Sequence, residues 1–512
     1  MNPQRSDRRS LLKAAASTSL VGLLPACATG PAGERRADLA ELDASTAIAG
    51  MKAGSFSAEA YAQTLLDRAT KYRNLNAFIA LDPQRVMEAA RAADLKRRSG
   101  DPLGSLHGLP VVIKDAVNVS GFATTAGTGG LRDYRPKATA PVVQAMQSQG
   151  AIIMGKANLH ELSTGWTNNN PVFGPARNPY DIDRVPGGSS GGTAVAIAAR
   201  ICSAGIAEDT NGSIRVPAAL CGVCGLRPST GRYSTQGTVP LAPSLDTLGP
   251  MARSVSDLAL LDSVVTGSSD TLAQAALKGM RIGIPRSFYE GLDSEVESSV
   301  NEALRRLRSD GAVLVEADLP DAFKLTAGIT VNLIYYEMPR SVSKFLREED
   351  IHLTIEQLLE KASPDIQKAY AAIIGDPRNL RPIPEDAYLN AKNKLQPALR
   401  VLYREYFGQN RVAAILHPPV MALAPRISST YVSPGPDVEV NGKLTPGRTV
   451  FSRNIAPSSA AGLPSVVLPA GLSRSGLPVS LELDGPAGAD RRLLGVAMAI
   501  EKSLGQLPAP KI

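Results

Sequence analysis

Short, continuous apolar runs recur along this 512-residue chain and alternate with helical patterns. The run at 109–113 ends directly in Lys114 and Asp115, and its length is typical of a buried strand. Other strand-like runs cover 151–154, 281–285, 312–316, 412–416 and 465–468, and helical patterns cover 140–149, 192–200, 294–308 and 490–503. The alternation predicts an α/β protein with a wide, largely buried sheet covered by helices.

The rest of the chain is predicted to be mostly helical. Residues 42–98 read as helices, with Ser57 as a capping residue and a second helix after Asp82-Pro83. Residues 325–404 are again mostly helical and more polar, so we expect a cap or insertion there. Because no linker rich in proline, glycine or charge divides the chain, one large domain with subdivisions is allowed at this length.

Composition and charge limit the class of protein. Apolar residues make up 44% and charged residues 20%, which is typical of a folded globular protein. The net charge of +7 comes from 55 basic and 48 acidic residues spread along the chain, without a basic stripe interleaved with aromatic residues. This pattern argues against a nucleic-acid partner. No apolar stretch is long enough for a typical membrane span.

The N-terminus has the plan of a bacterial signal peptide, which we place at residues 1–28. Arg8 and Arg9 precede an apolar run at 14–26, and paired arginines at that position resemble the twin-arginine type. We therefore expect an exported protein of the periplasm or cell envelope. Cleavage after Ala28 and acylation of Cys27 as a lipid anchor are both open, and a basic tail on a cytosolic protein is the alternative.

Residues that bind metals are sparse. Cys221 and Cys224 form a C-x-x-C pair, but no second pair or His-x-His spacing completes a metal cage, so buried inert thiols are expected. His160 and Glu161 have no second histidine nearby and are interpreted as polar packing. We expect no metal and no cofactor.

Two glycine-serine strings, which contain Ser189 and Ser213, enclose an apolar helical pattern. The first string fits the G-x-S-x-G nucleophile elbow, for which His352 or His417 would be the base. An elbow must follow a strand, however, and the residues before this string carry two prolines and no strand pattern. A phosphate-binding loop is also disfavoured, because no Gly-Lys-Ser/Thr sequence follows.

Together with the lysine that follows the buried strand, these strings resemble the amidase signature family. The matching segments are 108–115, 155–158, 160–162, 187–192, 209–217 and 246–250, with weaker similarity at 462–464 and 476–479. The resemblance implies one large domain, 29–512, with a mixed sheet covered on both faces by helices. Within the family, the runs 168–174 and 178–181 look most like bacterial hydrolases of arylalkyl amides such as mandelamide and indoleacetamide.

The resemblance implies a role for three residues. Ser213 matches the nucleophile, Ser189 the bridging serine held by a cis peptide bond after Gly188, and Lys114 the general base. A serine hydroxyl is a weak nucleophile until a neighbour removes its proton, and a lysine can do this only when it is neutral. Burial at a strand end disfavours the charged form of lysine. Ser189 would relay the proton and later deliver it to the leaving amine.

The turn before Ser213 is expected to point backbone N–H groups at the developing oxyanion, those of Thr210, Asn211 and Gly212 together with that of Ser213. The family usually has glycine where Asn211 stands, and asparagine is among the few residues that tolerate a left-handed backbone. We expect the Asn211 side chain to lie beside the scissile group and to alter the preference for substituents there.

Residues near the two strings receive structural or substrate-binding interpretations. Asp209 and Arg215 are expected to form a buried ion pair that holds the turn. By the resemblance, Thr164, Gly165 and Trp166 border the acyl pocket, where an aromatic side chain would suit an aryl substrate. Ordinary packing of Trp166 is the alternative.

The sequence therefore predicts a metal-free hydrolase that cleaves the C–N bond of a small aryl or arylalkyl amide through a serine acyl-enzyme and releases ammonia or an amine. An esterase, anilide or carbamate hydrolase on the same residues, a glutamine-hydrolysing amidotransferase subunit, and a non-enzymatic envelope binding protein remain alternatives. The expected partner is a small-molecule amide, and a homodimer is left open.

Overall fold

The structure is a computed structural model, and it describes residues 38–269, 272, 275–374, 383–428 and 436–512. Leu39–Ile512 forms one compact unit. The predicted signal segment 1–28, with Cys27 and the paired arginines, lies outside the described residues, as does the predicted domain boundary at 29. In the described part of the chain, no helix is both long and apolar enough to cross a membrane.

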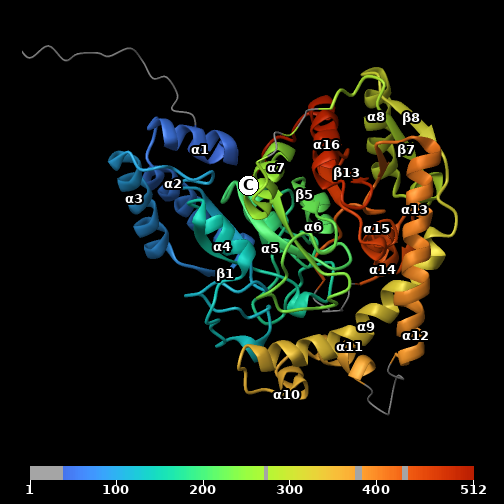
Figure 1. Ribbon diagram of the computed structural model, residues 1–512, viewed down its shortest axis with the longest axis horizontal. Helices are drawn as coiled ribbons and strands as arrows, with labels where there is room; N and C mark the ends of the chain where they lie inside the picture. Colours follow the sequence, from blue (N-terminus) through green and yellow to red (C-terminus); the bar gives the residue numbers. More distant parts are fainter. Residues whose placement is uncertain (1–37, 270–271, 273–274, 375–382, 429–435) are drawn as a thin grey trace, which may run out of the picture. The chain divides into compact units, whose positions relative to one another are not determined.

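An eleven-stranded sheet runs through this unit (Figure 1), and its strands follow the order β1-β3-β2-β4-β6-β5-β12-β13-β9-β7-β8. The strands are β1 (Phe78–Leu81), β2 (Pro110–Lys114), β3 (Ile152–Ala157), β4 (Ala204–Asp209), β5 (Cys224–Arg227), β6 (Thr247–Ala252), β7 (Arg281–Ile284), β8 (Val313–Glu316), β9 (Ala414–His417), β12 (Ser465–Leu472) and β13 (Pro478–Asp484). β2 lies parallel to β3 and β4, and β7 lies parallel to β8 and β9. The other neighbouring pairs are antiparallel, so the predicted mixed sheet is confirmed. A separate hairpin joins β10 (Val438–Val440) to β11 (Lys443–Thr445).

Both faces of the central strands are covered. Every residue of β2, β3, β4, β6 and β13 is buried. Because successive side chains of a strand point to opposite faces, burial without alternation requires a covering layer on each side. The helices are α1 (Ala44–Ala53), α2 (Ala58–Lys71), α3 (Pro83–Ser99), α4 (Pro141–Ser148), α5 (Gly191–Ala198), α6 (Arg215–Cys221), α7 (Val255–Thr266), α8 (Ser294–Ser309), α9 (Ala322–Glu348), α10 (Ile355–Glu360), α11 (Pro364–Ile374), α12 (Glu385–Asn390), α13 (Gln396–Asn410), α14 (Gly447–Ser452), α15 (Ala456–Ala461) and α16 (Asp490–Leu504).

Capping side chains set the start of the first long helices. Ser57 accepts a hydrogen bond from the Ala60 N–H at the start of α2. Asp82 accepts one from the Arg85 N–H at the start of α3, where Pro83 has no N–H that needs a partner. Both helices therefore begin where the sequence predicts.

Several strands differ from the prediction. β1 lies within the segment that was predicted to be entirely helical, and β4, β5, β6 and β13 were not among the predicted strands. β4 is rich in alanine and glycine, β5 has only four residues, one of them glycine, and β13 begins with a proline, so their local preference for strand is weak. They are strands because each pairs its backbone with a neighbour on both sides in the sheet.

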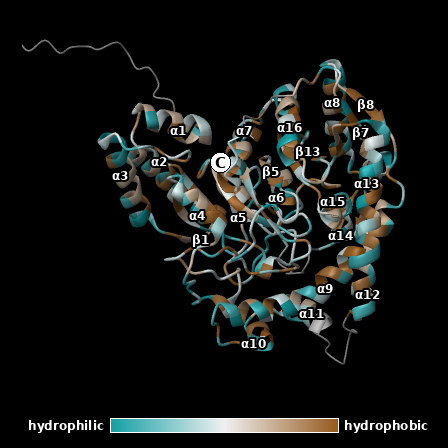
Figure 2. Ribbon diagram, viewed as in Figure 1, coloured by the Kyte–Doolittle hydropathy of each residue, from teal (hydrophilic) through white to brown (hydrophobic). Residues whose placement is uncertain are grey.

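The segment 325–404, for which a cap or insertion was predicted, is mostly helical in its described residues, which include most of α9 and all of α10 to α12 and reach into α13. Apolar residues of α9 and α10, among them Val342 and Leu358, share one buried cluster with Leu159 and Leu162 from the loop after β3. Figure 2 shows brown and teal stretches along α9 and α13, as expected for helices with one buried face. The helices α9 and α10 therefore pack on the loop that leaves the sheet at the carboxyl end of β3.

Candidate active site

Charged side chains gather where three neighbouring strands end. Lys114 is the last residue of β2, Lys156 is next to last in β3, and Glu208 and Asp209 end β4. Because β2 lies parallel to both β3 and β4, these carboxyl ends lie at one edge of the sheet. Such an edge is where open α/β sheets usually bind ligands.

Lys114 is fully buried and contacts one of the two predicted serines. Its Nζ donates a hydrogen bond of 2.7 Å to Ser189 Oγ and forms an ion pair of 3.2 Å with Glu208 Oε2. Burial lowers the pKa of Lys114 from its ordinary value, and the charge of Glu208 acts in the opposite direction. The amine is therefore easier to deprotonate than that of an exposed lysine.

Ser189 follows a glycine that the packing requires. The peptide bond between Gly188 and Ser189 is cis, as the resemblance implies. A Cβ atom on Gly188 would lie 2.8 Å from the carbonyl oxygen of Gly165 and 2.8 Å from the amide nitrogen of Asn168, which is closer than side chains approach. The two loops therefore pack backbone to backbone.

The predicted ion pair between Asp209 and Arg215 is present and fully buried, with 3.1 Å between Asp209 Oδ2 and Arg215 Nε. Asp209 also pairs with Arg227 at 2.8 Å and accepts hydrogen bonds from the N–H groups of Gly212 and Ile214 at 2.8 and 3.1 Å. Burial alone would raise the pKa of Asp209, but the charges of the two arginines outweigh it and lower that pKa. An ionised carboxylate thus holds the turn.

Ser213 lies in this turn, where the two glycine-serine strings meet. The Ser190 N–H donates a hydrogen bond of 3.2 Å to the carbonyl oxygen of Ser213. Among the described residues, the Ser213 hydroxyl has no hydrogen-bond partner, so the bond from Ser213 to Ser189 that a relay needs is not formed. Catalytic hydrogen bonds are often long without substrate and tighten only in its complex.

Two expectations for the turn need correction. The Gly212 N–H is bonded to Asp209 and is not free to face a substrate oxygen. The N–H groups of Thr210, Asn211 and Ser213 have no hydrogen-bond partner within the described ranges. The left-handed residue of the turn is Gly212, with a φ of 106°, and not Asn211. Glycine adopts this conformation without steric cost, so Asn211 needs no unusual backbone here.

The Asn211 side chain joins the turn to its surroundings. Its Nδ2 donates a hydrogen bond of 2.8 Å to Ser452 Oγ on α14, and its Oδ1 is buried without a hydrogen-bond partner in the described part of the chain. Trp166 Nε1 donates a hydrogen bond of 3.2 Å to the Asn211 carbonyl oxygen. Trp166 is only partly buried. The structure thus brings a predicted pocket residue against the predicted oxyanion turn.

The loop that carries Thr164 and Gly165 is held from several sides. Thr164 Oγ1 donates a hydrogen bond of 2.8 Å to the Glu161 carbonyl oxygen, and a Cβ atom on Gly165 would lie 2.3 Å from the His160 ring. The Glu161 carboxylate accepts hydrogen bonds from Ser363, which lies between α10 and α11. The predicted polar packing of His160 and Glu161 is confirmed, and the segment between α10 and α11 contacts this loop through Glu161.

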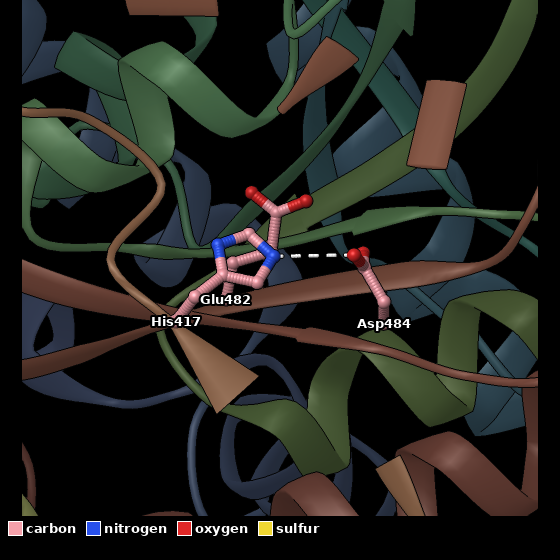
Figure 3. A group of neighbouring side chains, drawn as sticks. All are labelled: His417, Glu482 and Asp484. Atoms are coloured by element: carbon pink, nitrogen blue, oxygen red, sulfur yellow. Dashed lines mark hydrogen bonds and ion pairs between the residues drawn. The ribbon is translucent and has the colours of Figure 1, made fainter. Parts of the chain in front are cut away.

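Behind the turn lies a buried group with the chemistry of metal ligands: His417 on β9 and Glu482 and Asp484 on β13 (Figure 3). His417 Nε2 lies 3.1 Å from Asp484 Oδ2, and its Nδ1 lies 3.2 Å from the Pro418 carbonyl oxygen. Both ring nitrogens face acceptors, and a protonated imidazole satisfies both. Burial lowers the pKa of His417, but the hydrogen bond and charge of Asp484 outweigh burial and raise it. Glu482 Oε1 pairs with Arg215, whereas Glu482 Oε2 is buried without a hydrogen-bond partner in the described part of the chain.

The other candidates from the sequence lie outside the site. His352 is 91% exposed and lies near Asp350, and the His417 ring contacts Asp484 and the Pro418 carbonyl oxygen. In the described part of the chain, neither imidazole has a hydrogen bond to Ser189 or Ser213. Cys221 and Cys224 are free and buried, and burial raises the pKa of both thiols. The prediction of inert thiols is confirmed.

Sequence reasoning missed Glu208. Among the described residues, its carboxylate is the one that forms an ion pair with Lys114. The same signal that singled out Lys114 was present, because a charged residue follows the short apolar stretch 204–207 directly. The stretch was not recognised as a strand because it consists mostly of alanine and glycine.

Comparisons with known proteins agree with this geometry. The family model Amidase matches residues 60–494. The chain is 36% identical over 462 residues to an indoleacetamide hydrolase of Allorhizobium ampelinum, covering 90% of this chain and 97% of the relative. It is 33% identical over 464 residues to a mandelamide hydrolase of Pseudomonas putida, covering 87% of this chain and 88% of the relative. A crystal structure of an amidase, 32% identical, has a TM-score of 0.80 and covers 91% of this chain and 100% of that chain. The chain therefore belongs to the amidase family, and it is an amide hydrolase.

Proposed function

We propose that the chain hydrolyses a small aryl or arylalkyl amide through an acyl-enzyme on Ser213 and releases ammonia or an amine. The observation that carries this proposal is the buried Lys114 amine, whose Nζ lies 2.7 Å from Ser189 Oγ beside the turn of Ser213. The similarity to an indoleacetamide and a mandelamide hydrolase supports the aryl substrate class.

In the first step, Ser213 Oγ attacks the carbonyl carbon of the amide. Its proton passes to Ser189 Oγ, and the hydroxyl proton of Ser189 passes to the neutral Lys114 amine. A bond forms between Oγ and the carbonyl carbon, and the π electrons move to the carbonyl oxygen. Burial helps this step because it disfavours the ammonium form of the resting lysine.

The negative oxygen that develops is stabilised by backbone donors of the turn. We assign this role to the N–H groups of Thr210, Asn211 and Ser213, which have no other hydrogen-bond partner within the described ranges. Gly212 contributes instead by holding the turn on Asp209. Loss of one such donor typically costs about 10²–10³ in rate.

In the second half, the proton returns along the same path. The Lys114 ammonium gives a proton through Ser189 to the leaving nitrogen, the C–N bond breaks, and ammonia or an amine departs. Water then attacks the ester on Ser213 with the same base, and the carboxylic acid is released. Serine and lysine end the cycle in their starting protonation states.

A substrate panel tests this function. Hydrolysis rates for primary arylalkyl amides, anilides, carbamates and esters of matched acyl groups should be highest, relative to the uncatalysed rates, for the arylalkyl amides. A fluorophosphonate should label the wild type and not Ser213→Ala, in equal amounts of folded protein. Turnover of carbamates or esters without turnover of any amide would contradict the proposal.

Asn211 offers a test of substrate preference within the same site. Its side chain lies between Ser452 and the oxyanion turn, and Oδ1 is buried without a partner among the described residues. We expect Asn211→Gly to remove this polar group and change the ranking of amides that differ in their α-substituent. An unchanged ranking across the panel would show that Asn211 does not contribute to specificity.

We also propose that residues 1–28 direct export, on the basis of the sequence pattern alone. The full chain with Arg8→Lys and Arg9→Lys should stay in the cytoplasmic fraction, while the unaltered chain should reach the cell envelope in shortened form. Equal distribution of both chains would contradict this proposal.

A further inference from the structure

Glu208 is a buried carboxylate whose position relative to Lys114 is set from two directions. It lies on β4, and Lys114 ends the parallel neighbour β2. Its Oε2 lies 3.2 Å from Lys114 Nζ and accepts a hydrogen bond of 3.0 Å from Ser163 Oγ. Its Oε1 is buried and has no hydrogen-bond partner in the described part of the chain. One carboxylate oxygen therefore pairs with the lysine, and the other could still accept a hydrogen bond.

The loop that supplies Ser163 has an unusual backbone. Leu162 and Ser163 both have left-handed conformations, with φ of 49° and 57°. Such conformations cost about 1–3 kcal/mol each for residues other than glycine and persist only where the surroundings enforce them. Here Leu162 packs in a buried cluster, and Ser163 directs its hydroxyl at Glu208. The loop thus fixes the carboxylate as well as bordering the site.

The chemistry of the proposed reaction gives this carboxylate a task. When Lys114 takes up the proton of Ser213 by way of Ser189, an ammonium forms in a place without access to solvent. A buried cation without a partner is very costly. We propose that Glu208 is the positioning residue of the base: it holds the Lys114 amine against Ser189, balances the ammonium during turnover, and sets the pH range of activity. This inference rests on the proposed role of Lys114.

Other titratable groups surround the pair and bear on its pH response. They are Asp209 on β4, Asp246 before β6, His160 beside Ser189, and Tyr370 on α11. Asp246 can also titrate in the acidic range, because burial and the charge of Glu208 raise its pKa above the ordinary value. An acidic limb of the rate profile must therefore be assigned between Lys114 and Asp246.

The test is the pH profile of kcat/KM in the full chain with Glu208→Gln. Glutamine keeps the size but removes the negative charge that favours the ammonium, so Lys114 stays neutral to lower pH. The midpoint of the acidic limb should move down by about 1–3 pH units, the range for a lost opposite charge at this distance. The limiting rate at high pH should fall by up to about tenfold for each pH unit that the midpoint moves, because a weaker base drives proton transfer less. A merely structural role would lower the rate at every pH and leave the midpoint in place.

Glu337→Gln is the matched control, since Glu337 is also a buried glutamate that accepts from a serine, Ser244, and does not pair with Lys114. Its midpoint should equal that of the wild type. The variant Asp246→Asn shows which group causes the acidic limb of the pH profile. If the limb persists in this variant, it belongs to Lys114; if the limb disappears, the inference is overturned.

Two more variants keep the result decisive. If Glu208→Gln does not fold, Glu208→Asp keeps the charge but moves it away by one methylene group, and a downward midpoint shift supports the inference. The inference is overturned if the folded Glu208 variant keeps the wild-type midpoint of kcat/KM while Lys114→Ala is inactive. Lys114→Ala with wild-type turnover would overturn the proposed base itself, and this inference with it.

Discussion

Two fully buried lysines lie at the carboxyl ends of neighbouring parallel strands, and their surroundings give one a structural role and the other a chemical role. Lys156 Nζ on β3 donates hydrogen bonds of 2.9 Å to the Ala123 carbonyl oxygen and to Thr124 Oγ1, and lies 2.9 Å from Asp115 Oδ1. Lys114 Nζ on β2 has only the Ser189 hydroxyl and the ion pair with Glu208 among the described residues. Burial lowers the pKa of both lysines.

The partners decide what each lysine can do. The Thr124 hydroxyl donates its own proton to the Val117 carbonyl oxygen, so it only accepts from Lys156, whose ammonium also donates to the Ala123 carbonyl oxygen and pairs with the Asp115 carboxylate. The Ser189 hydroxyl has no other acceptor in the described part of the chain, so it can turn and donate to a neutral amine. Lys156 is therefore placed as a fixed cation and Lys114 as a base.

The sharpest test of this difference is activity. Lys114→Met should lower kcat/KM for the best arylalkyl amide by about 10²–10⁴, the usual contribution of a general base. Lys156→Met, measured on folded protein, should stay within about tenfold of the wild type, since it removes no group that handles the proton. Equal losses in the two variants would remove the distinction between the lysines.

For the free energy of unfolding we expect the opposite order, with the larger loss in Lys156→Met. Lys156→Met leaves the Asp115 carboxylate buried without its ion pair, which typically costs about 3–5 kcal/mol of the free energy of unfolding. Lys114→Met also leaves a buried carboxylate, that of Glu208, without its ion pair, but it should cost somewhat less, because Lys114 has two polar partners and Lys156 has three among the described residues. Urea unfolding of both variants at one pH measures the difference. The double variant Lys156→Met, Asp115→Leu should recover part of the loss, and no recovery would show that the ion pair is not the cause.

The two lysines also show what the sequence could and could not reveal. Lys114 was identified because a cation directly after a buried strand is unusual. Its contact with Ser189 joins positions 75 residues apart, so only the family resemblance, and no local pattern, paired them. The ion pair of Asp209 with Arg215 was predictable because six residues separate them, whereas the pairing of Arg215 with Glu482 spans 267 residues.

The fold was predicted where local signals were strong. Capped helices and runs of β-branched residues were found, whereas β4, with its alanines and glycine, was not. Because β4 was not predicted, Glu208 at its carboxyl end was not identified as the negative charge that pairs with the base. The donor set of the turn was misassigned for a related reason: the Gly212 N–H is taken by Asp209, a contact that depends on the turn's three-dimensional shape.

The pH dependence of the wild type refines the comparison. Catalysis needs neutral Lys114, so activity is present above the folded pKa of this lysine and is lost as pH falls through it, tenfold per pH unit. Burial lowers that pKa, so the midpoint of kcat/KM should lie below the ordinary lysine value of about 10.4. Lys156 titrates outside the proton path, so Lys156→Met should lower the curve without moving its midpoint. If the midpoint moves in Lys156→Met, the two lysines titrate as one coupled pair. Their different hydrogen-bond partners would then not determine which lysine acts as the base.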